Sequence, residues 1–327
     1  MLLERQFGEI INVKNLTIEA PEGAGFDMRR EFEALKSSTF YDGRRKRWRW
    51  GLDNAQNPDR DRAYRASPEL LALFINGQFQ NEGIAEEYAT LKRTPIHNAE
   101  KKMWYPQNPR MGVSMENHFY TQDQLLDILV ELRLDRNLGH NKYEALMNNS
   151  NFRWQGYWYH QVLDRGFFGI AQPDGHTSHD QLIGIFVESF FDKEKAQERY
   201  DQLKGSDFHV RRGQYSFWCL YLEDTQRPDN VPVISSNNEL MSILVHAQFD
   251  REQARVEYEA LKKTKLFDHA KRQWIENVAI EDSTMKMRNL NRTSYVQLLD
   301  ILVRNAIRQP NPQFETQTPS LPEARNF

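Results

Sequence analysis

The sequence predicts a mainly α-helical protein with small β-hairpins, built from five tandem helix–hairpin–helix repeats of about 55–58 residues. Three observations predict this fold. A short helical motif recurs at a steady spacing, a second apolar helix follows each copy, and an aromatic residue, usually tryptophan, recurs between the two. Repeats that pack only on their neighbours build curved superhelices or closed rings. A curved α/α superhelix and an α/α toroid both remain possible, and we favour the curved stack.

The first helix of each repeat carries an aromatic residue three places before a leucine. The leucines are separated by 56, 55, 57 and 58 residues, at Leu35, Leu91, Leu146, Leu203 and Leu261. Residues three apart share a helix face, so the ring and the leucine can be buried together. The expected organisation is a strand or loop remnant at 1–25, a single repeat domain at 26–308 with repeats at 26–80, 81–136, 137–192, 193–250 and 251–308, and a proline-rich extended or disordered tail at 309–327.

The second helix is marked by a hydroxyl residue three places before Gln or Glu. This pattern occurs in four copies: Thr121 with Gln124, Ser178 with Gln181, Ser236 with Glu239, and Ser294 with Gln297. It is typical of a capping box, in which the two side chains satisfy free amides at a helix start. Apolar pairs follow, and their spacing predicts a helix that is packed on more than one side.

About thirty residues separate the two helices, and we place a small β-hairpin there. Trp48, Trp104 and Trp274 lie 13 residues after the repeat leucine, Tyr159 holds that place in the third copy, and Trp218 comes two residues later in the fourth. An isolated hairpin is only marginally stable in water. We therefore expect the recurring tryptophans to fix each hairpin to its helices.

Composition narrows the function classes. The formal net charge is −3 with 27% charged residues, which excludes a chain-wide preference for nucleic acid or acidic substrates. No apolar run reaches the roughly 18 residues of a membrane helix, and the first residues do not resemble a signal peptide. The single cysteine, Cys219, cannot form an internal disulfide. We expect a cytoplasmic protein that needs neither membrane nor cofactor.

Basic residues gather at the expected hairpin tips: Arg44, Arg45, Arg47, Lys101, Lys102, Arg211, Arg212, Lys271 and Arg272. If stacked hairpins point in one direction, these residues form a ridge that could bind a polyanion, such as nucleic acid, an acidic glycan or an acidic protein surface. Lysine and arginine also protect exposed sheet edges from aggregation, so part of the set has a structural explanation.

Four aromatic residues fall outside the repeat register and are better binding candidates than the recurring tryptophans. They are Trp50, Trp154 and Tyr157, and Tyr221 is a fourth aromatic residue of this kind. Flat aromatic faces can stack on sugar rings or nucleic-acid bases.

Acid–base residues near the starts of the second helices are the candidates if the protein is an enzyme. A toroidal enzyme that acts on glycans would set carboxylates or histidines around the mouth of its inner barrel. Asp123, Asp180 and His176 fit that place. Helix starts favour acids in any case, and no acid is seen to break the repeat pattern. The motif formed by His176, His179 and Asp180 supplies too few ligands for a zinc site, so no metal is expected.

In general plan the repeat is similar to several α/α-repeat families, including toroidal glycosidases and epimerases, but no family's motif matches residue by residue. The leading hypothesis is a non-catalytic repeat protein that binds a protein, polyanionic or glycan partner, or assembles with itself, through the basic and aromatic hairpin ridge. The alternative is an α/α-toroid enzyme acting on carbohydrate as a hydrolase, lyase or epimerase.

Overall fold

The computed structural model describes residues 26–51, 65–79, 83–105, 117–164, 170–212, 215–220, 222, 233–281, 284–286 and 292–308. Over these residues the chain is mostly helical with small antiparallel hairpins, which confirms the predicted fold class. The expected segments at 1–25 and 309–327 lie outside the described residues.

The helices fall into an outer and an inner set. The outer helices are α2 (Met28–Lys36), α5 (Ile84–Lys92), α7 (Arg136–Met147), α9 (Lys193–Lys204) and α11 (Arg251–Lys262). The inner helices are α4 (Ala66–Asn76), α6 (Thr121–Leu134), α8 (Ser178–Glu188), α10 (Ser236–His246) and α12 (Ser294–Arg308). The outer helices bury only one face, whereas all residues of α4 and α8 are buried. The broad apolar pattern of the second helices therefore reflects packing on several sides.

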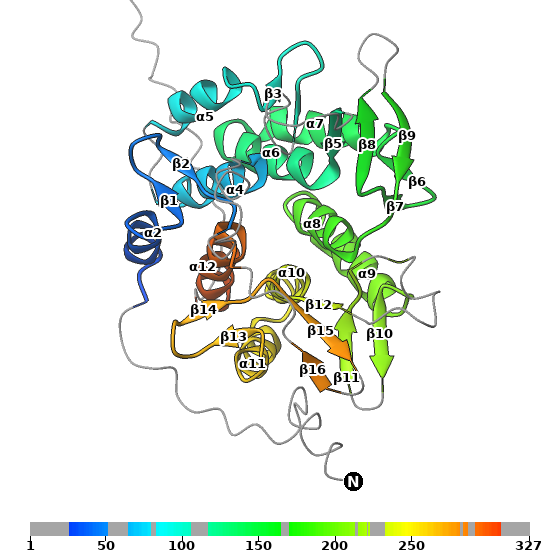
Figure 1. The fold of residues 1–327 in the computed structure, drawn as a ribbon. Helices are drawn as coiled ribbons and strands as arrows, with labels where there is room; N and C mark the ends of the chain where they lie inside the picture. Colours follow the sequence, from blue (N-terminus) through cyan, green and yellow to red (C-terminus); the bar gives the residue numbers. More distant parts are fainter. Residues whose placement is uncertain are drawn as a thin grey trace, which may run out of the picture.

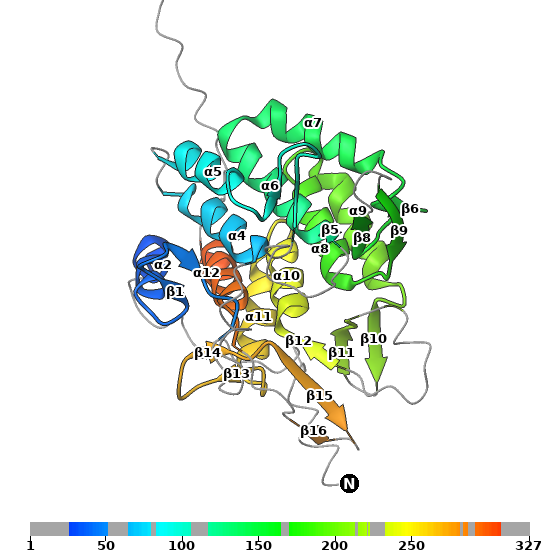
Figure 2. The ribbon, with the colours of Figure 1, turned by 45° about the horizontal axis from the view of Figure 1, so that its top comes forward.

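The inner helices form a closed ring (Figure 1). In sequence order α4 packs on α6, α6 on α8, α8 on α10 and α10 on α12, and α12 then packs on α4 and on α2. Figure 2 shows the same ring tilted, with α12 beside both α4 and α10. The chain is thus an α/α toroid, and the open stack that we favoured from the sequence is not formed.

A short hairpin follows each outer helix. The strand pairs are β1 (Tyr41–Asp42) with β2 (Arg47–Trp48), β3 (His97–Asn98) with β4 (Met103–Trp104), β6 (Arg153–Trp154) with β7 (Tyr157–Trp158), β10 (His209–Arg212) with β11 (Tyr215–Trp218), and β13 (Phe267–Asp268) with β14 (Gln273–Trp274). Each second strand ends in a buried tryptophan. In the third unit this residue is Trp158, not the Tyr159 that the spacing indicated, because the two-residue turn of Gln155 and Gly156 shortens that hairpin.

The Gln or Glu near each inner-helix start holds the hairpin tryptophan, an arrangement that we call the hairpin anchor. The side-chain oxygen accepts a hydrogen bond from the tryptophan backbone N–H in all five units: Glu69 with Trp48 at 3.0 Å, Gln124 with Trp104 at 3.0 Å, Gln181 with Trp158 at 2.8 Å, Glu239 with Trp218 at 2.8 Å, and Gln297 with Trp274 at 3.1 Å. The predicted capping boxes are therefore not formed as such. These side chains join hairpin to helix, and the amide members also donate to the tryptophan carbonyl.

The hydroxyl residues that open the inner helices join neighbouring units. Ser236 Oγ donates to Ile275 O at 2.5 Å, and Thr121 and Ser178 make equivalent bonds to the hairpins of the next units. The last unit is joined to the first by a backbone hydrogen bond, in which Ser294 N donates to Trp50 O at 3.0 Å. Backbone hydrogen bonds thus help to close the ring.

Two three-stranded sheets extend this pairing and were not predicted. One has the order β5 (Asn117–Tyr120), β8 (Gln161–Asp164), β9 (Ile170–Asp174), and the other β12 (Val233–Ser235), β15 (Asn277–Glu281), β16 (Thr284–Lys286). In each, the strand before an inner helix pairs with the strand after the next unit's hairpin. Such pairing joins segments about forty residues apart, which local patterns do not reveal.

Candidate functional site

Polar side chains join the N-terminal ends of the inner helices at one end of the ring. Ser67 of α4 donates to Asp123 of α6 at 2.6 Å, and Asn238 of α10 donates to Ser178 of α8 at 2.9 Å. Buried polar groups are costly unless they are hydrogen-bonded, and these two contacts provide partners for such groups between neighbouring inner helices.

A second set of side chains reaches this end from the hairpins. These residues lie two places after each hairpin tryptophan and include Trp50, His160 and Glu276. Their backbone carbonyls accept hydrogen bonds from the first amides of α12, α6 and α10, at 3.0, 3.1 and 2.8 Å. The pairing between units therefore places this repeat position beside the inner-helix starts.

The cluster has two layers that differ in burial. A deep layer consists of Asp123, His179, Asp180 and Tyr295, none of which is more than 6% exposed. The central rim consists of half-buried residues: Trp50, Arg65, Tyr120, His160 and Glu276. The central rim is thus partly accessible, whereas the deep layer beneath it is not.

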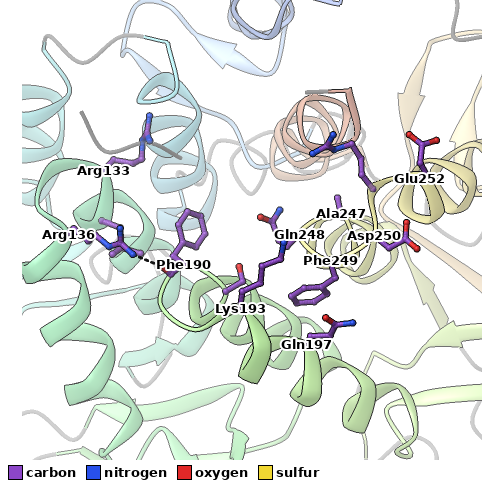
Figure 3. A pocket seen from close by; sticks show the side chains of 13 residues that line it. Arg133, Arg136, Phe190, Lys193, Gln197, Ala247, Gln248, Phe249, Asp250 and Glu252 are labelled. Carbon is purple, nitrogen blue, oxygen red and sulfur yellow. Dashed lines mark hydrogen bonds between the residues drawn. The ribbon is translucent and has the colours of Figure 1, made fainter. Parts of the chain in front are cut away.

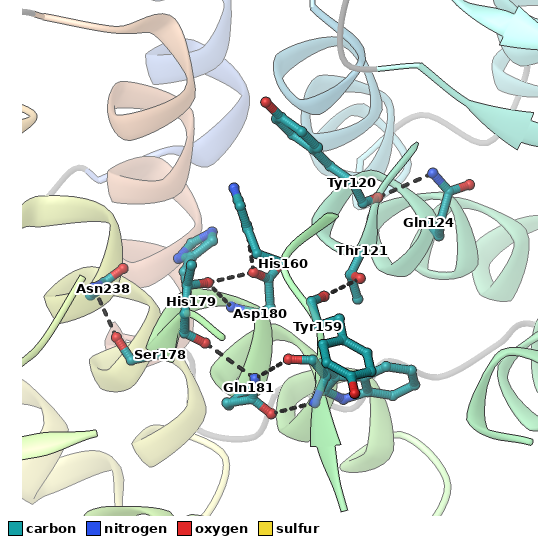
Figure 4. A network of polar contacts seen from close by, with 12 residues as sticks. Tyr120, Thr121, Gln124, Tyr159, His160, Ser178, His179, Asp180, Gln181 and Asn238 are labelled. Atoms are coloured by element: carbon teal, nitrogen blue, oxygen red, sulfur yellow. Dashed lines mark hydrogen bonds and ion pairs between the residues drawn. The ribbon is translucent and has the colours of Figure 1, made fainter. Parts of the chain in front are cut away.

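The best-defined contact in the cluster joins His160 to Asp180 (Figure 4). His160 Nδ1 lies 2.8 Å from Asp180 Oδ2, and the Thr177 hydroxyl donates to the same oxygen. Asp180 is 1% exposed, whereas the His160 side chain is 19% exposed. With Nδ1 donating to the carboxylate, Nε2 carries the lone pair that can accept a proton. This is the arrangement of a histidine base held by a buried carboxylate.

Asp123 is a buried carboxyl on the neighbouring inner helix. Its burial raises the pKa to about 7, although the Ser67 hydrogen bond and the Arg65 charge oppose this shift. Its Oδ2 atom has no hydrogen-bond partner among the described residues. An acid with a pKa near neutrality can both give and take a proton at neutral pH.

Glu276 and Arg65 complete the titratable part of the central rim. Burial raises the pKa of Glu276, and the Arg65 charge and an Asn237 hydrogen bond lower it by less. The Arg65 guanidinium lies 4.1 Å from the centre of the Trp50 ring, which itself stacks on Tyr295. The positive charge of Arg65 thus acts on both Asp123 and Glu276.

His179 supports the deep layer in a neutral form. Its Nε2 lies 2.9 Å from the Tyr295 hydroxyl, and burial lowers its pKa to about 4. Within the described part of the chain, no group of three or more His, Cys, Asp or Glu side chains is arranged to hold a metal ion.

The structure brings together some of the residues that the sequence indicated. Asp123, Asp180 and Trp50 meet in this cluster. The His176 ring instead lies against the Tyr159 ring, with centroids 4.7 Å apart, and His160 takes the place beside Asp180. The structure thus places the His176 ring beside Tyr159 and the His160 ring beside Asp180.

The basic residues of the hairpins are not brought together. The hairpins are distributed around the ring (Figure 1), so their tips form no single ridge. Arg44, Lys101, Lys102, Lys271 and Arg272 lie in separate turns, and Arg45 and Arg47 line a cleft of about 720 Å³ beside Glu86 and Glu87. The side chains of Arg211 and Arg212 lie outside the described residues.

Trp154 and Tyr157 face each other across the hairpin of β6 and β7, 55% and 39% exposed. They are available at the surface, away from the central rim. In the described part of the chain no helix is long and apolar enough to cross a membrane.

His160 and Glu276 are the residues that sequence reasoning missed. They occupy the repeat position where the other units have Trp50, Pro106 and Leu220. A comparison of the repeats at this position would have found an acid and a histidine that break the pattern. The search for such a residue among the helix starts alone looked at the wrong place in the repeat.

Comparison with known proteins supports the fold. No protein-family model matches the chain, and no curated protein matches it. Among solved structures, it is similar to a novel alpha-amylase from Clostridium perfringens (TM-score 0.53, 11% identity, 89% of this chain and 100% of the other) and to an endoglucanase from Komagataeibacter sucrofermentans (0.53, 12%, 86% and 98%). A D-mannose isomerase is also similar (0.52, 10%, 94% and 97%).

These likenesses overturn the leading hypothesis of the sequence analysis. The three solved structures named above are matched over nearly their whole length and are named as enzymes of carbohydrates, and none of them is named as a scaffold or a protein-binding repeat. The non-catalytic scaffold was inferred because every notable residue seemed explained by the repeat. The buried polar cluster is not explained by it, so that inference was wrong.

Proposed function

We propose that this protein is an enzyme that acts on a carbohydrate by general acid–base catalysis at the N-terminal ends of the inner helices. The observation that carries the proposal is the His160–Asp180 pair, in which a buried carboxylate orients a partly exposed imidazole at 2.8 Å. The named activities of the solved structures that share the ring support a carbohydrate substrate.

His160 is the proposed general base. Its Nδ1 hydrogen is committed to Asp180, so that Nε2 can take a proton from a sugar hydroxyl, a carbon-bound hydrogen or a water. Asp180 stabilises the imidazolium that forms and keeps the ring in one orientation. A neutral amide at position 180 would lose this charge stabilisation.

Glu276 is the proposed general acid. Burial raises its pKa, which favours the protonated form that an acid needs, and its half-buried position lets it contact a ligand. Arg65 would stabilise negative charge that develops on a sugar oxygen. Asp123, which is fully buried, is proposed to position the cluster through Ser67 rather than to contact the substrate.

The test is a screen of the full chain on oligosaccharides and free sugars. Release of reducing ends reports hydrolysis, proton NMR reports isomerisation or epimerisation, and absorbance of a new double bond reports a lyase. On the best substrate, Asp180→Asn and Glu276→Gln should each lower kcat by about 100-fold or more, with the unfolding temperature little changed. Glu239→Gln is the matched control, since it removes a buried acid of a hairpin anchor.

Two results would contradict the proposal. One is turnover that survives both Asp180→Asn and Glu276→Gln. The other is the absence of turnover on every sugar of the screen by protein whose fold is verified by circular dichroism.

A further inference from the structure

A second cleft lies at the opposite end of the inner helices, and it shares no residue with the central rim (Figure 3). Its volume is about 700 Å³, which is the size of a small-molecule site. It is bounded by the last turn of α6, the loops that follow α8 and α10, and the first turns of α7, α9 and α11. We call it the opposite cleft.

Four cations line the opposite cleft, each from a different helix: Arg133 of α6, Arg136 of α7, Lys193 of α9 and Arg251 of α11. In the described part of the chain, none of them forms an ion pair with a carboxylate. Arg133 and Arg136 donate instead to the neutral backbone carbonyls of Gly77 and Phe190, at 2.5 and 2.9 Å, where each keeps its full charge.

The position of three of these cations is not explained by helix stability. Arg136, Lys193 and Arg251 are the first residues of their helices. The positive end of the helix dipole disfavours a cation there. Ten residues before the repeat leucine, where these three cations lie, the other two units have Gly25 and Asn81. The charges are therefore present only in the three units that border the opposite cleft.

The two acids of the cleft are engaged elsewhere. Asp250 caps α11, with its carboxylate accepting from Gln253 N at 3.0 Å, and Glu252 pairs with Arg255 at 2.5 Å. Both carboxylates therefore have partners outside the cleft, whereas the four cations have no carboxylate partner among the described residues. The lining keeps an excess of positive charge for a ligand to neutralise.

The remaining lining is suited to a sugar ring. Phe190 and Phe249 are half-buried and present phenyl groups from two neighbouring loops. The Gln248 side chain lies near Lys193, and the Gln197 side chain lies beside Phe249 (Figure 3). Aromatic faces stack on the C–H face of a pyranose, amides bond its hydroxyls, and arginines bind carboxylate or sulfate groups bidentately.

From this combination we propose that the opposite cleft binds an anionic sugar, that is, a uronate or a sulfated or phosphorylated saccharide. Arg136 and Lys193 bind its acidic group, and Phe190 and Phe249 hold its ring. The site does not depend on the catalytic proposal, because it lies at the other end of the ring and is tested by binding alone.

The experiment is isothermal titration calorimetry of the full chain with glucuronate, galacturonate disaccharide, glucose 6-sulfate, glucose and acetate. We expect the acidic sugars to bind and glucose and acetate to bind at least tenfold more weakly, since each lacks one of the two features. Arg136→Ser with Lys193→Ser should weaken binding of the acidic sugars at least tenfold, since both residues are exposed and their loss leaves the core intact.

The control variant, Arg29→Ser with Lys263→Ser, removes two exposed cations far from the cleft and should bind the acidic sugars as the unchanged chain does. Equal binding of acetate and glucuronate would overturn the proposal, because it would show an anion site without sugar recognition. Equal losses in the two double variants, or no binding of any acidic sugar, would also overturn it. Loss of binding with unchanged turnover separates this proposal from the catalytic one.

Discussion

The hairpin tryptophan and the residue two places after it are close neighbours in the sequence. The first is the same residue in all five units, whereas the second differs from unit to unit. The tryptophan is buried in every unit, and a Gln or Glu holds its backbone each time. The next position but one holds a tryptophan, a proline, a histidine, a leucine and a glutamate. The fold of the ring requires tryptophan at the first position and tolerates different residues at the second. A catalytic or binding residue can therefore occupy the second position. Within a repeat, variation is the better guide to function.

Loss of a hairpin tryptophan side chain should have the largest effect on stability. Trp158 is fully buried, and its Nε1 fits against Gly184, where an added Cβ would lie only 2.1 Å away. Trp158→Ala should lower the free energy of unfolding by about 3–5 kcal/mol, since it leaves a cavity between hairpin and helix. Urea unfolding followed by circular dichroism measures this. A loss below about 1 kcal/mol would show that the anchor does not stabilise the ring.

The acids of the hairpin anchors predict a dependence of stability on pH. Burial raises the pKa of Glu239 from 4.5 to about 8, and its equivalents include the neutral Gln124, Gln181 and Gln297. The folded state therefore binds the proton more tightly than the unfolded state does. The stabilisation is complete below about pH 4.5 and is lost as the pH rises through about 8.

Glu239→Gln should remove the loss of stability that the unchanged chain shows as the pH rises. Between pH 5 and 9 its free energy of unfolding should rise relative to that of the unchanged chain, and thermal unfolding across this range measures the difference. Glu33→Gln, which removes an exposed carboxylate of α2, should give a constant difference. A constant difference for Glu239→Gln as well would show that Glu239 is ionised in the folded protein at neutral pH.

The smallest effect is expected for the second tryptophan of the same hairpin. Trp154 is 55% exposed, against 0% for Trp158. Trp154→Ser should change the free energy of unfolding by no more than about 0.5 kcal/mol. The pair of substitutions thus separates the two tryptophans by several kcal/mol within one hairpin. Similar losses for both would show that the hairpin contributes as a whole, without a specific anchor.

The architecture could be predicted from the sequence because the same structural unit occurs five times. The leucine and tryptophan spacings reflect contacts within a unit, and five copies reinforce each signal. Closure of the ring could not be predicted, since it depends on Ser294 meeting Trp50 from the other end of the repeat array. The three-stranded sheets were missed for the same reason, as their strands pair between units.

The sequence indicated three residues of the candidate site, namely Asp123 and Asp180 at helix starts and Trp50 just after a hairpin. Asp123 and Asp180 were found because helix starts can be read from local patterns. His160 and Glu276 were missed because their place over the helix starts follows from pairing between units. His176 lies close to Asp180 in the sequence, but the chain turns its ring toward Tyr159. Proximity in the sequence therefore did not predict which side chains contact each other in the ring.

The most direct test of the central claim compares these two histidines. On the best substrate of the screen, kcat/KM is measured for His160→Ala and His176→Ala, each checked for an unchanged circular dichroism spectrum. The His160–Asp180 pair predicts a loss of at least about 100-fold for His160→Ala and a change within about threefold for His176→Ala. A large loss for His176→Ala with His160→Ala still active would contradict the proposed base and the site built around it.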